Sequence, residues 1–143
     1  MRRVLVTGSR DWKARTTVWN ALRSELEYAY YTLGTGLTVV HGACPTGTDD
    51  IADRWAYGLT AMGWPIHIER HPANWTEHGK RAGPLRNREM AESGVVVCHA
   101  FPVEGSTGTR HCMSRCFAAG VPVVNHGYQP YTLQAKEFAE AYG

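Results

Sequence analysis

The stretch Val4-Leu5-Val6-Thr7-Gly8-Ser9-Arg10 decides the fold of this 143-residue chain. Its three consecutive apolar residues predict a short buried strand, and the glycine that follows them predicts a tight turn. Residues 14–31 are typical of an amphipathic helix, because apolar side chains recur there at a spacing of four: Val18, Leu22 and Leu26. A strand, a glycine turn and a helix in this order indicate the first unit of an α/β sheet.

The same alternation continues along the chain. Four further apolar runs predict strands: Thr38–Val40, Pro65–Ile68, Gly94–Cys98 and Val121–Val124. Helical patterns follow several of them: one with Ile51, Trp55 and Leu59, one with Met113, Phe117 and Ala118 that ends at Gly120, and one over Gln134–Tyr142. The sequence therefore predicts a single three-layer Rossmann-like domain over residues 1–143, with a mainly parallel sheet of about five strands.

Composition narrows the class of protein. A hydrophobic fraction of 43% and a charged fraction of 20% are typical of an ordinary globular protein and exclude a disordered one. The net charge of +2 is too small to indicate nucleic-acid binding by bulk charge. The apolar run after Met1-Arg2-Arg3 is too short for a secretion signal, and no run is long enough for a membrane span. We expect a cytoplasmic protein with no membrane partner.

The four cysteines form no C-x-x-C pair, so we expect reduced thiols. Cys112 and Cys116 lie one helical turn apart beside His111, and His99 and His126 are further candidate zinc ligands. This spacing matches no known zinc motif, and we expect neither a metal nor a cofactor.

Ligands of parallel sheets bind beyond the carboxyl ends of the strands, where the strand order reverses. The loops after the first, second and fourth predicted strands are rich in glycine and small hydroxyl residues, and each leads toward a helix. The predicted ligand-binding residues are Gly8, Ser9, Arg10, His41, Gly42, Thr48, Asp49, Gly105, Ser106, Thr107, Gly108 and Thr109, together with Arg86 and Asn87 described below.

Gly105–Thr109 is the best phosphate candidate, because glycines and unpaired N–H groups at a helix start attract anions. The alternative is a tight turn capped by Thr107 or Thr109. Arg10 is placed to clamp a phosphate at the switch point. Asp49 and Asp50 would repel a phosphate. We therefore expect Asp49 to bind ribose hydroxyls; the alternative is that it only caps the helix that begins there.

A basic run covers Lys80–Met90, and Pro84 is expected to open a helix there. Arg86 and Met90 would then share one face of that helix while Arg88 points elsewhere. The alternative is a solvated basic surface. The irregular stretch 70–83 before it is expected to be a functional loop. Its His71 and Trp75 either stack on a base or anchor the loop.

Together these stretches resemble the SLOG superfamily, the Rossmann-like group that contains DNA-processing protein A and the Lonely-guy enzymes, and most of all its small stand-alone YspA-like members from bacteria and phages. The matching segments are Val4–Arg10, His41–Ala52, Arg86–Met90 and Gly105–Thr109. The resemblance implies a nucleotide-type ligand in the crevice that these loops form.

Lonely-guy enzymes cleave the N-glycosidic bond of nucleoside monophosphates. Their signature pairs an arginine, four residues before a methionine, with a Gly-Gly-x-Gly-Thr-x-x-Glu loop. The resemblance places Arg86, Met90, Gly105, Gly108 and Thr109 on that signature. Ser106 replaces the second glycine, and the catalytic glutamate falls on Cys112, whose thiol cannot supply a carboxylate. The catalytic candidates that remain are Arg86, Glu104 and Asp49, with His41 as a further acid-base group.

Three functions stay open at this stage. The favoured one is a non-catalytic binder of a phosphorylated nucleotide, acting as a sensor or sequestering protein. The second is a nucleotide-processing hydrolase of the Lonely-guy kind. The third is a single-stranded DNA-binding protein similar to DNA-processing protein A, supported by the basic run with Trp75. A homodimer is also open, with the aromatic group Tyr28, Tyr30 and Tyr31 at its interface or at the core edge.

Overall fold

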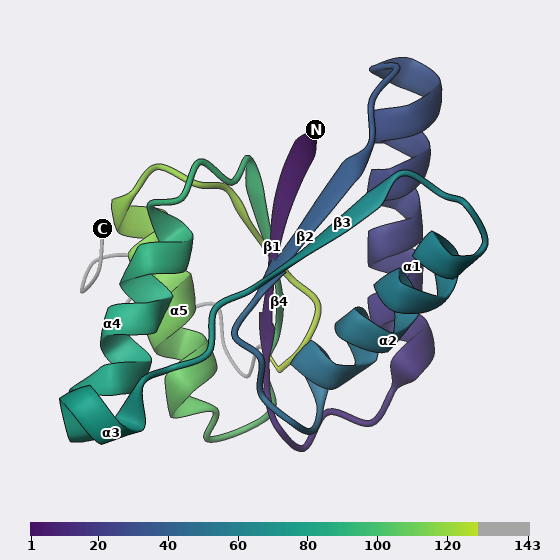
Figure 1. Ribbon diagram of the computed structural model, residues 1–143. Coiled ribbons are helices and arrows are strands. Elements are labelled where there is room, and N and C mark those ends of the chain that lie inside the picture. The colour runs from purple at the N-terminus through teal and green to yellow at the C-terminus, as the bar shows by residue number, and fades with distance from the viewer. Residues whose placement is uncertain (129–143) are drawn as a thin grey trace.

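The computed structural model describes residues 1–128, which form one parallel sheet between two layers of helices (Figure 1). The strands are β1 (Arg2–Gly8), β2 (Leu37–His41), β3 (Ile66–Arg70), β4 (Val97–Phe101) and β5 (Val123–Asn125). Their order is β3-β2-β1-β4-β5, and every neighbouring pair is parallel. The prediction of a Rossmann-like α/β fold with a parallel five-stranded sheet is confirmed.

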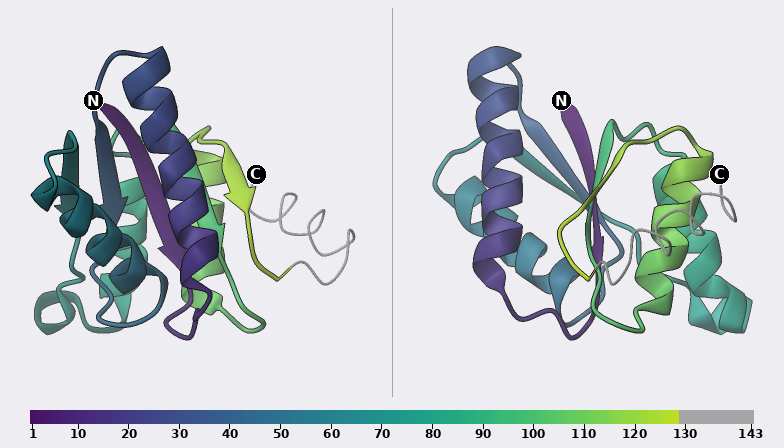
Figure 2. Two further views of the ribbon diagram at one scale, coloured as in Figure 1. Left: turned by 90° about the vertical axis from the view of Figure 1, so that its right-hand side faces the viewer. Right: turned by 180° about the vertical axis from the view of Figure 1, so that it is seen from behind.

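The helices cover both faces of the sheet. They are α1 (Arg15–Glu27) with the π-helical turn η1 (Tyr28–Thr32), α2 (Thr48–Ala61), α3 (Trp75–His78), the 3₁₀ turn η2 (Gly79–Arg81), α4 (Ala82–Ala91) and α5 (Thr107–Ala118). Figures 1 and 2 show α1 and α2 on one face and α4 and α5 on the other. Within residues 1–128, no helix is long and apolar enough to cross a membrane.

The central strand β1 separates two hydrophobic cores. Val4 and Val6 pack with α1 and α2, whereas Leu5 packs with α4 and α5. Successive side chains of a strand point to opposite faces, so a strand buried on both faces must be apolar at every position. This explains the uninterrupted run Val4-Leu5-Val6 that identified the fold.

Several element boundaries differ from the predictions; the first helix ends at Glu27 rather than near residue 31, and the fifth strand begins at Val123 rather than Val121. The fourth strand begins at Val97 rather than Gly94 and continues to Phe101. The reason is its pairing with β1, in which Val97 lies opposite Val4; the exposed Val96 precedes the ladder and donates its N–H to the carbonyl of Arg3. The prediction from valine content alone therefore put the start of this strand three residues too early.

The stretch 70–83 is not an irregular loop, because it contains α3 and η2. The Asn74 side chain caps α3 by accepting a hydrogen bond from the N–H of Glu77. Pro84 does not open its helix, which already begins at Ala82. It lies in the first turn, where a missing N–H costs nothing. The predicted helix Gln134–Tyr142 lies outside the described residues.

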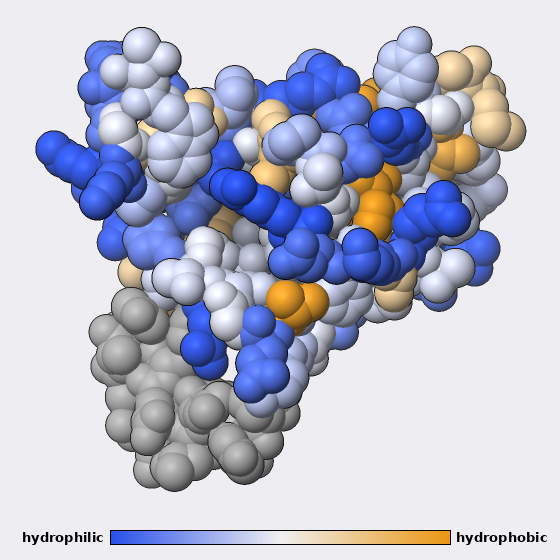
Figure 3. All heavy atoms as spheres, turned by 90° about the horizontal axis from the view of Figure 1, so that it is seen from below, coloured by the Kyte–Doolittle hydropathy of each residue, from blue (hydrophilic) through white to orange (hydrophobic). Residues whose placement is uncertain are grey.

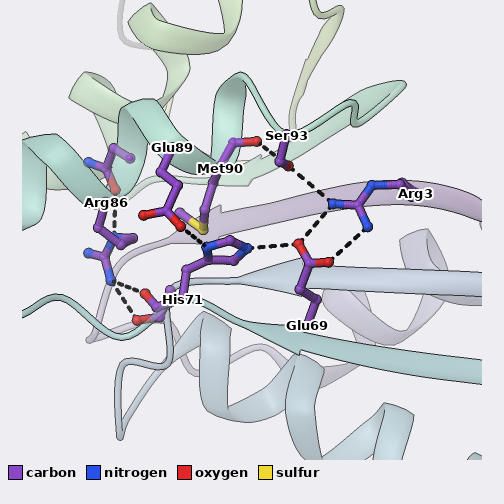
Figure 4. A network of polar contacts seen from close by, with 9 residues as sticks. Arg3, Glu69, His71, Arg86, Glu89, Met90 and Ser93 are labelled. Carbon is purple, nitrogen blue, oxygen red and sulfur yellow. Dashed lines mark hydrogen bonds and ion pairs between the residues drawn. The ribbon is translucent and has the colours of Figure 1, made fainter.

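A polar network fixes α4 against the sheet (Figure 4). Arg3 of β1 donates two hydrogen bonds of 2.9 and 2.8 Å to the carboxylate of Glu69 on β3, and a third to Ser93 after α4. His71 bridges Glu69 at 2.7 Å and Glu89 of α4 at 3.2 Å. The hydrogen bonds from Arg3, with a smaller contribution from His71, lower the pKa of Glu69 from 4.5 to about 2.

Replacing Glu69 by Gln tests this network. We expect Glu69→Gln to lower the free energy of unfolding at pH 7 by about 1–2 kcal/mol, because a bidentate charged hydrogen bond is lost. A lowered carboxyl pKa stabilises the fold above the unfolded value and loses that effect as the pH falls. The difference between the two proteins should therefore shrink between pH 4.5 and about 2 in urea titrations. The matched variant Glu92→Gln weakens two partly exposed ion pairs, with Arg88 and Arg115, and should change stability by under about 0.5 kcal/mol.

Candidate functional site

A cavity of about 300 Å³ lies beyond the carboxyl ends of β1 and β4. The chain passes from β1 to β2 on one side and reaches β4 on the other, so these two neighbouring strands mark the point where the strand order reverses. Figure 3 shows the molecule from this end, where hydrophilic residues predominate. The volume lies at the lower end of the range for small-molecule sites.

Most of the predicted ligand-binding residues line this cavity. Those that do are Gly8, Ser9, Arg10, Gly42, Asp49, Arg86, Asn87, Gly105, Ser106, Thr107, Gly108 and Thr109. The catalytic candidate Glu104 also lines it. The remaining wall residues, which the sequence reasoning missed, are Thr7, Asp11, Cys44, Met90 and Val103. Each lies close to a predicted residue along the chain or on the same helix face. This proximity is the feature of the sequence from which they could have been predicted.

Thr48 does not line the cavity, because it packs beneath the first loop. Its side chain is fully buried and its hydroxyl donates to the carbonyl of Ser9 at 3.3 Å. A Cβ atom at Gly8 would lie 2.2 Å from the Thr48 hydroxyl, and one at Gly47 would lie 2.2 Å from the Ser9 carbonyl. These two glycines therefore serve the close packing of two loops.

His41 also lies away from the cavity, with a side chain only 2% exposed. Its Nδ1 accepts a hydrogen bond from the N–H of Ala43 at 2.9 Å, so the ring proton resides on Nε2 and is donated to Asp53 at 2.7 Å. Asp53 is held in turn by Arg70, which lowers its pKa together with His41. Ala43 has a φ of 59°, a region that favours glycine, and this hydrogen bond helps to hold it there.

The wall formed by α5 carries unpaired backbone donors. Ser106 is the N-cap residue, so the alternative in which Thr107 or Thr109 caps this helix is wrong. Its hydroxyl accepts from the N–H of Val103 and caps nothing in the helix. Within residues 1–128 the N–H groups of Gly108 and Thr109 have no hydrogen-bond partner, as the first turn of a helix leaves them.

Arg86 and Asn87 join three walls of the cavity. The Arg86 guanidinium donates to the carbonyls of Gly42 and His71 and to the side chain of Asn87 (Figure 4). Asn87 donates to the carbonyl of Gly108 at 3.3 Å. The predicted sharing of one helix face by Arg86 and Met90, with Arg88 elsewhere, is confirmed, because both line the cavity and the exposed Arg88 pairs with Glu92.

Asp49 supplies a buried acid to the opposite wall, with a side chain 7% exposed. Its carboxylate accepts a hydrogen bond from the N–H of Cys44 at 3.1 Å. Burial raises the pKa of Asp49, while backbone hydrogen bonds from Cys44 and Gly42 and the nearby Arg86 guanidinium oppose the rise. Arg10 lies exposed in the cavity wall, so the cavity combines two guanidinium groups with three acidic residues, which are Asp11, Asp49 and Glu104.

Cys112, at the position of the Lonely-guy glutamate, lies in the core and not in the cavity. Hydrogen bonding with Cys116 and burial raise its pKa well above the usual thiol value. Its neighbours Cys98 and Cys116 are equally buried, whereas Cys44 is partly exposed in the cavity wall. Across residues 1–128, no group of three or more His, Cys, Asp and Glu side chains is arranged to hold a metal ion.

Comparison with known proteins agrees with this geometry. A family model described as "YspA, cpYpsA-related SLOG family" matches residues 2–78, more than half of the chain. The chain belongs to this SLOG family. It is also 55% identical over 130 residues to the Gene 61 protein of Mycobacterium phage D29, covering 91% of this chain and all of that protein. The sequence-based assignment to the YspA-like group of SLOG proteins is confirmed.

Thiol reactivity gives a direct test of the cavity wall. We expect one thiol per native chain, Cys44, to react readily with 5,5′-dithiobis(2-nitrobenzoate), because the other three thiols are buried and therefore inert. All four should react in denaturant. Cys44→Ser should abolish the rapid native reaction; rapid labelling of Cys112 in the folded protein would contradict the buried position described here.

Proposed function

We propose that this SLOG protein binds a phosphorylated nucleotide or nucleotide-derived ligand in the cavity, as a sensor or sequestering protein. Membership of the family suggests a nucleotide-related function. The observation that carries the proposal is the convergence of the unpaired N–H groups of α5 with Arg10 and Arg86 on one cavity. Helix N-terminal N–H groups and guanidinium groups are the donors that bind phosphate in proteins.

Two observations support binding without turnover. The position of the Lonely-guy glutamate holds a buried thiol of raised pKa, which cannot act as a carboxylate. His41 is fully engaged with Ala43 and Asp53 outside the cavity. The absence of turnover is tested by incubating the protein with a panel of nucleoside monophosphates and measuring free base. Release of base would show that the protein is a hydrolase and not a non-catalytic binder.

The basic run supports DNA binding less well. Arg88 pairs with Glu92, and both ring nitrogens of His71 contact carboxylates. The ring of Trp75 lies against Gly83, where an added Cβ atom would be 3.3 Å from it. These contacts favour a structural role for His71, Trp75 and Arg88 in anchoring α3 and α4.

Native mass spectrometry of the freshly purified protein, followed by calorimetry with nucleoside 5′-monophosphates, tests the proposal. A co-purifying nucleotide or a measurable dissociation constant for a monophosphate supports it. A ligand-free protein that binds none of the panel overturns it.

Gly108→Asp tests the phosphate position. A Cβ atom at Gly108 meets no other atom within 4 Å, so the side chain fits, and an acidic residue in the first turn suits the helix dipole. We expect the variant to fold normally and to bind nucleoside monophosphates at least about 30-fold more weakly, because a carboxylate faces the anion.

The matched variant Gly108→Asn has nearly the same shape without the charge. It should stay within about fivefold of the wild-type dissociation constant, since a neutral side chain leaves the electrostatics of the helix start intact. Equal affinities of the two variants in calorimetry would show that the phosphate lies elsewhere.

A further inference from the structure

The buried carboxylate of Asp49 is not explained by the fold. It lies in the first turn of α2, yet Gly47 is the N-cap and the helix has no side-chain cap hydrogen bond. Asp49 instead reaches back to the N–H of Cys44. Capping of α2, the alternative drawn from the sequence, is therefore not its role.

Asp49 makes no ion pair with the described residues, although the Arg86 guanidinium lies near enough to lower its pKa. Among the described residues, no lysine or arginine nitrogen lies within 4.0 Å of its carboxylate. Its neighbour Asp50 differs, because it pairs with Arg54 at 3.0 Å on the outside of α2. A buried, unpaired carboxylate is costly unless hydrogen-bond donors satisfy it. The N–H groups of Cys44 and Gly42 act as donors to the carboxylate, and Asp49 is one of the residues that line the cavity.

The chemistry of this acid determines what it accepts from a ligand. An ionised carboxylate is an acceptor only, so the matching ligand group must donate a proton in a hydrogen bond. A phosphate offers acceptors and negative charge, so it belongs at the α5 wall with Arg10. In a phosphorylated nucleotide, the donors next to the phosphate are the hydroxyl groups of the sugar.

We propose that Asp49 accepts hydrogen bonds from the ribose 2′,3′-diol and makes the cavity selective for ribonucleotides over deoxyribonucleotides. This inference rests on the proposed function, since it assigns the sugar end of the same ligand. It also gives a chemical reason for excluding DNA, whose sugar has no 2′-hydroxyl and whose internal 3′-oxygens are esterified. Asp49 is thus a specificity-determining residue.

The first test uses the unaltered protein. Calorimetry compares adenosine, guanosine, cytidine and uridine 5′-monophosphates with their 2′-deoxy and 3′-deoxy counterparts. We expect the loss of a hydroxyl to weaken binding by about 10- to 100-fold for at least one of the two positions, because a charged acceptor is left unsatisfied. Equal affinity of the ribo, 2′-deoxy and 3′-deoxy ligands overturns the inference.

The second test uses Asp49→Asn with Asp50→Asn as its control. The asparagine oxygen still accepts from the N–H of Cys44, so we expect the loop to keep its conformation. Both variants remove one negative charge from adjacent positions, but only Asp49 lines the cavity. The ratio of ribo to deoxyribo affinity should fall to within about threefold of one in Asp49→Asn, because an amide is a weaker acceptor of a hydroxyl proton. It should stay at the wild-type value in Asp50→Asn.

The outcomes separate this inference from the proposal on which it rests. If no monophosphate binds the wild-type protein, the proposed function fails. If ribonucleotides and deoxyribonucleotides bind equally, the site is a nucleotide site and the role of Asp49 fails. If selectivity exists but persists in a folded Asp49→Asn variant, another group reads the sugar and the inference is overturned.

Discussion

The close contact between the Gly8–Ser9 turn and the first residues of α2 is the constraint on which the cavity depends. Thr48 packs where a Cβ atom of Gly8 would be, and its N–H and hydroxyl both bind the Ser9 carbonyl. This contact fixes the loop after β1 to the loop after β2. Without glycine at both Gly8 and Gly47, the two backbones could not approach so closely. Arg10 and Asp49 then face one cavity from adjoining loops.

The cavity wall holds both acidic and basic side chains. The β2–α2 loop contributes a buried acid, whereas α5 contributes unpaired N–H groups. Arg86 and Asn87 span the distance between them, with hydrogen bonds to Gly42 on one side and Gly108 on the other. The network of Arg3, Glu69 and His71 holds α4 in the position that this bridging requires.

Much of this architecture is predictable from local pattern. Apolar runs located all five strands, and the rule that ligands bind beyond the carboxyl ends of parallel strands located most of the cavity wall. The errors share a physical cause, because they concern residues whose role is set by partners distant in the sequence. His41 and Thr48 each adjoin a glycine, as ligand-binding residues often do. In the structure, however, His41 bonds to Asp53 and Thr48 bonds to Ser9, and both side chains are buried. The start of β4 is likewise decided by its register with β1 and not by its valines.

The two walls of the cavity come from segments that are far apart in the sequence. Residues 7–49 supply one side, and residues 86–109 supply the other. During synthesis from the N-terminus, β1, β2 and β3 can pair before β4 exists, since they are consecutive neighbours in the sheet. The cavity closes only after α5 has left the ribosome and docked. A nascent chain therefore pairs its first three strands before the second wall of the cavity exists, and β5 joins the sheet only after α5 has been synthesised.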